Sequence, residues 1–208
     1  FSKFIKETFQ MKIILISLGF LMKLLLMAIA LLIKIDSPGP IIYKGKRTAI
    51  NDGIFYQYKF RTMVVDADKK GGFTAAVDDP RFTSLGRFLR KYKLDELPQF
   101  VNVILGDISL VGPRPQVTHY TSQYEGDNSL ILTVKPGITD LATLHFMDMD
   151  SVVGKGDVDN KYAREVEPVK NKLRLEYVKK RSFILDLRIL IETIFRLFGI
   201  KGITGLST

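Results

Sequence analysis

The chain of 208 residues contains no cysteine and only two histidines. Without cysteine there can be no disulfide bond, no zinc site with thiolate ligands and no thiol nucleophile. The two histidines, His119 and His145, are far apart in the sequence and lack the spacing of metal ligands. A metal bound by this chain would therefore be a hard ion, held by carboxylates and phosphates rather than by nitrogen or sulfur.

Several nucleotide-binding and metal-binding motifs are also missing. The sequence has no GxxxxGK[ST] motif, no GxGxxG after a predicted strand and no HExxH, which excludes P-loop, dinucleotide-binding and zincin sites. Predicted strands and helices do not alternate as they do in βαβ units. The pattern instead predicts an α+β fold that is predominantly helical.

Negative charge is scarce relative to positive charge. The chain has 31 Lys and Arg residues against 22 Asp and Glu residues, which gives a formal net charge of +9. This balance favours an anionic partner, such as a phosphorylated ligand, an anionic membrane surface or nucleic acid. A non-catalytic basic protein that binds a membrane surface or nucleic acid is one interpretation of this composition.

A long apolar stretch covers residues 11–35 and lacks the cleavage site of a secretory signal. The stretch is long enough to span a bilayer, but Lys23 lies at its midpoint, where a spanning helix would incur a cost of roughly 2.5–3.5 kcal/mol. Basic residues flank both ends, and positive charge marks the cytoplasmic side of a membrane. We therefore predict a re-entrant helix that enters and leaves on one face. A spanning helix and a buried core helix are the alternatives.

A second apolar pattern lies near the C-terminus and has helical spacing. Its members are Phe183, Ile184, Leu187, Leu190, Ile191, Ile194, Phe195 and Phe198. Basic side chains border this stripe, which predicts an amphipathic helix that lies in the membrane interface. A helix that packs against the protein core would show the same pattern, so both interpretations remain open.

The region between these segments begins with a predicted β-hairpin. Apolar runs at residues 41–43 and 54–60 are separated by Asn51-Asp52-Gly53, a turn signal. We predict two parts of the chain. Residues 1–36 form the membrane-inserted helix, and residues 37–208 form a compact cytosolic domain that ends in the amphipathic helix.

An acid pair, Asp95-Glu96, follows a cluster of cations made of Arg87, Arg90, Lys91 and Lys93. The apolar run after Pro98 predicts a helix with Asp95 as its N-cap. Because Pro98 lacks the N–H that a cap would usually bind, one oxygen of Asp95 should stay free. The helix end and the cations should both lower the pKa of Asp95. Such a carboxylate could attack a bound polyanion; a simple helix cap is the alternative.

Six short motifs occur in order along the chain, each weak alone but specific together. They are Lys34-Ile35-Asp36-Ser37-Pro38-Gly39-Pro40, Tyr58-Lys59-Phe60-Arg61-Thr62-Met63, Leu94-Asp95-Glu96-Leu97-Pro98-Gln99, Asn102-Val103-Ile104-Leu105-Gly106-Asp107, Gly112-Pro113-Arg114-Pro115 and Pro136-Gly137-Ile138-Thr139. With these motifs the chain resembles the bacterial sugar transferases, the monotopic polyprenyl-phosphate phosphoglycosyl transferases, over nearly its whole length.

The resemblance implies a reaction. A UDP-sugar would give its sugar-1-phosphate to a polyprenyl phosphate such as undecaprenyl phosphate, UMP would leave, and a lipid-linked diphosphate sugar would start a glycan. The resemblance also implies Mg²⁺ and a covalent intermediate on Asp95, which would be the nucleophile and a metal contact. Glu96 would assist, either by placing the metal or by deprotonating the acceptor phosphate.

The same resemblance implies roles for three cations. Arg90 and Arg114 would bind phosphates, and Lys59 would support the site. We expect Arg114 on a rigid proline-rich loop with its guanidinium exposed.

The resemblance further implies a bacterial inner-membrane protein with a re-entrant helix and a catalytic domain that faces the cytoplasm. The acid pair and the apolar N-terminal stretch, which nucleic-acid binding does not need, predict that nucleic acid is not a partner; a homodimer is a further expectation. Family members often carry a Ser-Pro pair that bends the re-entrant helix, whereas this chain has Met22-Lys23 at the corresponding place. Because the chain starts at Phe1 and some relatives carry a larger membrane domain there, an upstream segment is a further expectation.

Overall fold

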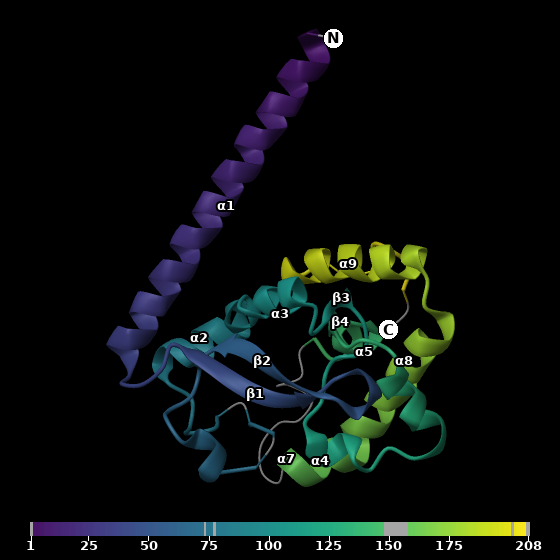
Figure 1. The fold of residues 1–208 in the computed structure, drawn as a ribbon. Coiled ribbons are helices and arrows are strands. Elements are labelled where there is room, and N and C mark those ends of the chain that lie inside the picture. The colour runs from purple at the N-terminus through teal and green to yellow at the C-terminus, as the bar shows by residue number, and fades with distance from the viewer. Residues whose placement is uncertain (1, 73, 77, 148–157, 201, 207–208) are drawn as a thin grey trace.

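Helix α1, Ser2–Asp36, is one continuous helix that projects from the rest of the chain (Figure 1). The computed structural model describes residues 2–72, 74–76, 78–147, 158–200 and 202–206. Within these residues, the segment Lys12–Asp36 of α1 is the one stretch long and apolar enough, by length and composition, to cross a membrane. The side chains of residues 16–25 are all exposed, which is consistent with membrane association.

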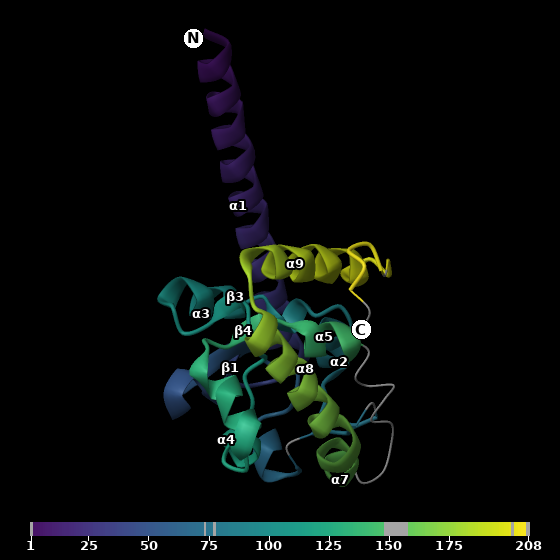
Figure 2. The ribbon, with the colours of Figure 1, turned by 90° about the vertical axis from the view of Figure 1, so that its right-hand side faces the viewer.

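The C-terminal part of α1 is anchored to the body. Ile29 and Ile33 are buried against Phe60 and Leu89 in one apolar cluster, and each such side chain contributes about 1.5–3 kcal/mol when it is fully buried. Towards the N-terminus the helix runs on without a bend in either view (Figures 1 and 2). The re-entrant topology therefore remains a prediction.

The predicted hairpin is confirmed. Strand β1, Ile42–Thr48, pairs antiparallel with strand β2, Ile54–Phe60. The turn between them contains a 3₁₀ turn, η1, Ile50–Asp52. Asn51 and Asp52 have φ angles of 53° and 57° there, a left-handed conformation that Asn and Asp tolerate better than most residues.

Two short helices and a 3₁₀ turn follow the hairpin and position the acid pair. Helix α2, Ser84–Lys91, begins after Thr83, whose side chain accepts a hydrogen bond of 2.9 Å from the Gly86 N–H. The turn η3, Leu94–Glu96, leads to helix α3, Gln99–Leu105. Helix α3 docks on the hairpin because Asn102 accepts a hydrogen bond from the Tyr58 N–H and donates one to the Tyr56 carbonyl, each 2.9 Å long.

A second, parallel sheet was not predicted from the sequence. Strand β3, Ser109–Val111, pairs with strand β4, Gly137–Thr139. Three-residue strands are too short to give an apolar alternation. The remaining short elements are η2 (Ala67–Lys69), α4 (Thr118–Thr121), η4 (Gly126–Thr133), α7 (Val158–Lys161) and a π-helical turn (Tyr162–Val166).

The main core lies where α5 (Leu141–His145), α8 (Glu167–Lys180) and α9 (Phe183–Leu197) meet the second sheet. It contains the buried side chains Val111, Leu141, Leu144, Tyr177 and Ile189. The described chain is thus mostly helical with two small sheets, which agrees with the α+β prediction at this level.

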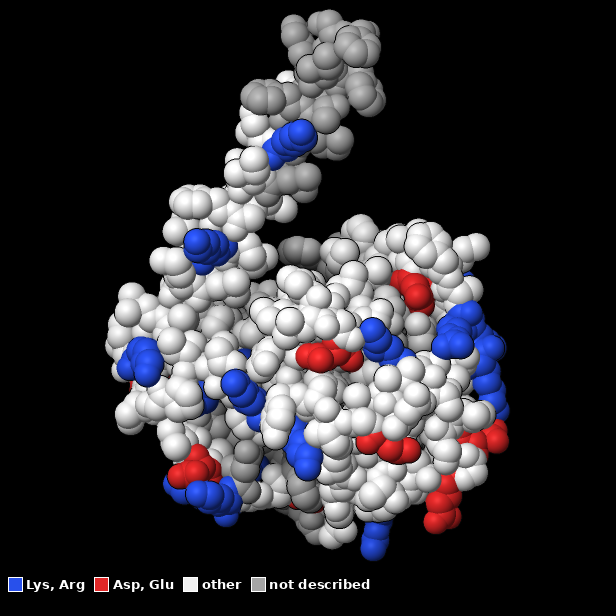
Figure 3. Space-filling view, viewed as in Figure 1, with Lys and Arg blue, Asp and Glu red and all other residues white. Residues whose placement is uncertain are grey.

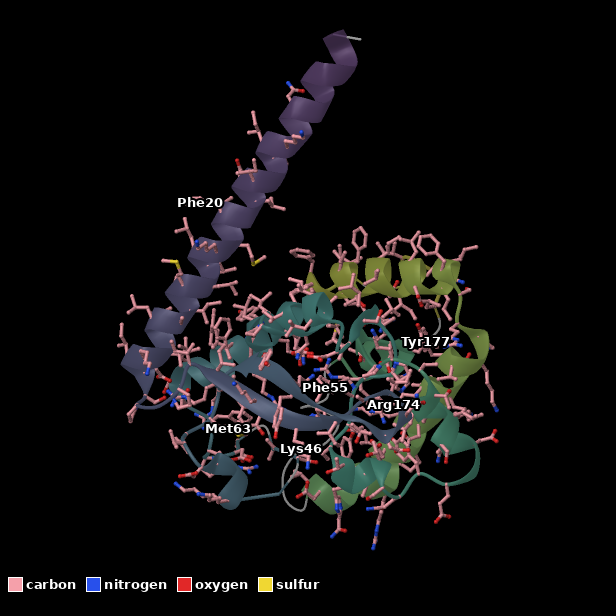
Figure 4. The ribbon with its side chains drawn as sticks, in the orientation of Figure 1. Phe20, Lys46, Phe55, Met63, Arg174 and Tyr177 are labelled. Carbon is pink, nitrogen blue, oxygen red and sulfur yellow. The ribbon has the colours of Figure 1, made fainter. Side chains whose placement is uncertain are left out.

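Helix α9 has an inner apolar face that packs against the core and an outer apolar face that is exposed. Ile189 is fully buried in the core. Phe183, Ile184 and Phe198 are 82%, 70% and 78% exposed, and the outer side chains of α9 point away from the body (Figure 4). Figure 3 shows few charged side chains along the upper edge of the body, where α9 lies. The placement of α9 in a membrane interface remains a prediction.

Candidate active site

A cavity of about 620 Å³ contains the acid pair. Its ionic wall is formed by residues from β2, α2, η3 and the loop after β3, namely Lys59, Arg90, Lys93, Asp95, Glu96 and Arg114. All five site residues that were predicted from the sequence therefore lie around one cavity. Residues from α3, β3, β4, α5, α8 and α9 contribute to its other walls.

Asp95 does not cap a helix, so this part of the prediction is wrong. It lies within the 3₁₀ turn η3, and the N-cap position of α3 is taken by Pro98. Lys93, with a φ of 57°, turns the chain before η3. Asp95 therefore lies before the N-cap residue of α3 and not at the cap position.

The Asp95 side chain is buried and has an oxygen without a partner. The residue is 7% exposed, and its Oδ1 atom has no hydrogen-bond partner among the described residues. Burial raises the pKa of Asp95, and the neighbouring charge of Glu96 adds to this effect, although Lys59 and Arg90 oppose it. The predicted lowering of this pKa is thus wrong, because desolvation outweighs the cations. The prediction of a free carboxylate oxygen is confirmed.

Glu96 is in the opposite situation, because two cations bind its carboxylate. Lys59 donates a hydrogen bond of 3.0 Å from Nζ to Oε1, and the Arg114 guanidinium forms an ion pair with the same oxygen. Burial acts to raise the pKa of Glu96, but Arg114 and Lys59 outweigh it and hold the pKa well below its usual range. Glu96 therefore stays ionised and holds both cations in the cavity.

The Arg114 guanidinium was predicted to be exposed, and this prediction is wrong. It lies partly buried in the cavity wall, where Nη1 donates a hydrogen bond of 2.7 Å to the Ile138 carbonyl and Nη2 contacts Glu96. The Arg114 N–H donates a 3.0 Å hydrogen bond to Oδ2 of Asp140, whose other oxygen caps α5 through the Thr143 N–H. The proline-rich loop thus directs its cation inward.

Lys59 and Arg90 come from different elements. Burial lowers the pKa of Lys59 from its usual value, with Glu96 acting in the opposite direction. The guanidinium of Arg90 lies 4.9 Å from the centre of the Phe82 ring, a cation–π contact that fixes a long side chain. Both cations therefore have defined positions at the cavity wall before any ligand binds.

Two cations of α8 were missed by sequence reasoning. Lys170 and Arg174 line the cavity, and Arg174 lies inside the body (Figure 4). Arg174 is paired with Glu167 at 3.0 Å. Lys170 lies 5.0 Å from the Tyr162 ring and has a pKa lowered to about 7, chiefly by burial. Lysine and arginine residues recur along α8 between apolar ones, so its sequence does not distinguish these two residues from solvated ones.

A magnesium ion would suit this cavity only as a partner of a phosphorylated ligand. The described residues contain no cluster of three or more His, Cys, Asp or Glu side chains that could hold a metal alone. Mg²⁺ is commonly held by one or two carboxylates together with substrate phosphates. The unpartnered oxygen of Asp95 fits that arrangement, whereas the carboxylate of Glu96 is already engaged by cations.

These features define a class of protein: a carboxylate and several cations surround a cavity that suits a phosphorylated ligand, beside an apolar helix of membrane-crossing length. The comparison with known proteins identifies the family within this class. The family model described as bacterial sugar transferase matches residues 1–199. The chain belongs to the bacterial sugar transferase family, which confirms the resemblance inferred from its motifs.

Several curated relatives are similar to this chain. The UDP-glucose:undecaprenyl-phosphate glucose-1-phosphate transferase of Escherichia coli (strain K12) is 38% identical over 85% of this chain and 37% of its own length. The UDP-N-acetylgalactosamine-undecaprenyl-phosphate N-acetylgalactosaminephosphotransferase of Aeromonas hydrophila is 34% identical over 82% of this chain and 38% of its own length. The uncharacterized sugar transferase EpsL of Bacillus subtilis (strain 168) is 35% identical over 82% of this chain and 76% of its own length. The chain thus spans little more than a third of the first two relatives.

Proposed function

We propose that this chain is a phosphoglycosyl transferase that moves sugar-1-phosphate from a UDP-sugar to a polyprenyl phosphate, through a covalent intermediate on Asp95. The observation that carries the proposal is the unpartnered, buried carboxylate oxygen of Asp95 in a cavity lined by cations. The names of the relatives above support the same donor and acceptor classes. They favour an enzyme over a non-catalytic protein that binds membrane or nucleic acid.

The first half-reaction would use Asp95 as nucleophile. One carboxylate oxygen attacks the phosphorus that bears the sugar, a bond from phosphorus to Asp95 forms, and the bond between the two donor phosphates breaks. UMP leaves with the bonding electron pair. Burial, which raises the pKa of Asp95, also removes water from the carboxylate, and a desolvated nucleophile is more reactive than a hydrated one.

The second half-reaction would release the sugar-phosphate. An oxygen of the acceptor phosphate attacks the same phosphorus, the acyl phosphate bond breaks, and Asp95 regains its carboxylate. Because the reaction is split in two, donor and acceptor need not occupy the cavity together. The product is a lipid-linked diphosphate sugar, which would start the synthesis of a glycan.

The cations would neutralise phosphate charge in both steps, which is the main requirement of phosphoryl transfer. We assign Arg114 and Arg90 to phosphate binding and Lys59 to support of the site. Glu96 is a positioning residue in this proposal. A carboxylate whose pKa is held low by two ion pairs is a poor base, so positioning is favoured over deprotonation of the acceptor.

Magnesium is part of this proposal. Asp95 would contact the ion together with donor phosphates, and the ion would add positive charge next to the transferred phosphoryl group.

The membrane arrangement is also part of the proposal. Helix α1 would insert from the cytoplasmic side of a bacterial inner membrane, with the body on that side and the outer face of α9 in contact with lipid. The exposed apolar residues of α9 support this arrangement. In this position a soluble donor and a lipid acceptor could both reach the cavity. A re-entrant α1 and a homodimer remain predictions.

The function is tested by turnover with a panel of UDP-sugars, undecaprenyl phosphate and Mg²⁺ in detergent micelles. We expect one sugar class to give UMP and a lipid-linked diphosphate sugar in equal amounts. The absence of both products for every donor in the panel would contradict the proposal.

A further inference from the structure

The cavity that holds the acid pair also has an apolar wall, on the side where α3 and α9 lie. This wall consists of Phe100 from α3, Leu110 from β3, and Ile194 and Leu197 from α9, all of which line the cavity. Each is a large apolar side chain that is 41–55% exposed. An exposed group of such side chains usually marks a binding surface. We call these four residues the apolar wall.

The apolar wall lies close to the membrane-type helix. Both views place α3 and α9 on the side of the body from which α1 projects (Figures 1 and 2). Leu97, which lines the same cavity, packs against the cluster that contains Ile29 and Ile33 of α1. A lipid that enters beside α1 would therefore meet the apolar wall and the ionic wall in one continuous cavity.

We infer that the apolar wall binds the polyprenyl chain of the acceptor where it joins the phosphate. This inference rests on the proposed function. The order of chemistry in the cavity matches a prenyl phosphate: Lys59 and Arg114 suit its phosphate, and the apolar wall suits the first isoprene units. The sugar and base of a UDP-sugar are polar, and burying polar groups without hydrogen-bond partners costs free energy. The apolar wall therefore suits the prenyl chain better than it suits the donor.

Ile194→Gln tests the inference. The change keeps the side-chain size roughly constant and adds an amide at a position that is 55% exposed, so the fold should tolerate it. We expect the KM for undecaprenyl phosphate to rise about tenfold, the factor that corresponds to about 1.4 kcal/mol. The rate of UMP release from the donor alone should change less than twofold, because the donor does not contact the wall.

Ile184→Gln is the matched control. Ile184 lies on the same helix and is 70% exposed, but it does not line the cavity. The same chemical change there alters the contact of α9 with the micelle and not the wall itself. We expect the KM for undecaprenyl phosphate to stay within twofold of the wild-type value.

Three results would overturn the inference and leave the proposed function standing, and a fourth would overturn both. An unchanged acceptor KM in Ile194→Gln would mean that the wall does not bind the acceptor, and an equal rise in both variants would assign the effect to general contact with lipid. Slower UMP release from the donor alone in Ile194→Gln would assign the wall to the donor. If wild-type protein releases no UMP from any donor, the proposed function fails and this inference falls with it.

Discussion

Asp95 and Glu96 are neighbours in the chain, yet the fold gives their carboxylates opposite surroundings. Glu96 is ionised between Lys59 and Arg114, whereas Asp95 is buried with an unpartnered oxygen. When folding raises the pKa of an acid, ionisation of that acid destabilises the folded state. When folding lowers the pKa, ionisation stabilises the folded state. At neutral pH, which is above the usual pKa of both acids, the charge of Asp95 therefore costs stability and the charge of Glu96 contributes it.

Isosteric amides should consequently change stability in opposite directions. We expect Asp95→Asn to stabilise the fold by about 1 kcal/mol, because the substitution removes a buried charge from the site. Glu96→Gln should destabilise it by about 1–3 kcal/mol, because two cations lose their partner. Each kcal/mol corresponds to roughly 2–4 °C in Tm for a chain of this size, which thermal unfolding in detergent at neutral pH would detect. Equal and destabilising shifts for both variants would contradict the assignment.

Lys170 should make stability depend on pH. Its pKa is lowered to about 7 from a model-peptide value of 10.5 by burial and by Arg174 and Arg114, with Glu167 and Asp140 acting in the opposite direction. Between these two values the unfolded chain binds a proton that the folded chain does not, so stability rises with pH. The rise is at most about 1.4 kcal/mol per pH unit for one proton.

Lys170→Met should abolish this dependence. We expect the wild-type Tm, relative to that of the variant, to increase as the pH is raised from below 7 towards 9. The measurement is the difference between the two thermal midpoints across that range. A difference that is constant with pH would show that Lys170 keeps its ordinary pKa.

At the scale of secondary-structure elements, the close contact between α2 and the end of the hairpin depends on one glycine. A Cβ atom added to Gly86 would lie 1.9 Å from the Thr62 carbonyl oxygen. Atoms at that distance must move apart, and overpacking of this kind costs about 1–3 kcal/mol. Helix α2 carries Arg90 and leads into η3, so its displacement would also disturb the cavity.

Gly86→Ala should therefore lower both stability and UMP release. Gly19→Ala is the control, because no atom lies within 4 Å of the added Cβ there and alanine favours a helix. Thermal unfolding and the donor-only assay should separate the two variants. Wild-type behaviour of Gly86→Ala would mean that α2 can shift without consequence.

The elements show where sequence reasoning worked and where it did not. The Asn51-Asp52 turn identified the hairpin because its left-handed residues leave a local signal. The Asp95 cap was wrong because the left-handed turn at Lys93 and the N-cap position of Pro98 place α3 later than the apolar pattern indicates. The pairing of β3 with β4 joins segments far apart in the sequence, and no local pattern records it. Lys170 reaches the cavity through the same long-range packing.

At the scale of the whole molecule, the prediction to test is that α1 enters and leaves the membrane on one face. The chain has no native cysteine, so single cysteines at Ser2 and Ser37 give clean labelling sites. We expect both to react with an impermeant thiol reagent from the same side of intact vesicles, because both flanks of α1 are basic. A cysteine at Ser122, which is exposed in the body, reports the side on which the body lies. Labelling of the cysteines at positions 2 and 37 from opposite sides of the vesicle membrane would establish a spanning helix.

The central claim is that Asp95 carries the sugar-phosphate during catalysis. Intact-protein mass spectrometry after incubation with a UDP-sugar and Mg²⁺, without acceptor, tests it most directly, with Glu96→Gln as the comparison variant and Asp95→Asn as the decisive one. We predict that wild-type protein gains the mass of one sugar-phosphate as UMP is released, that Glu96→Gln gains it more slowly, and that Asp95→Asn gains none. A normal adduct on Asp95→Asn, or full turnover by that variant, would contradict the claim.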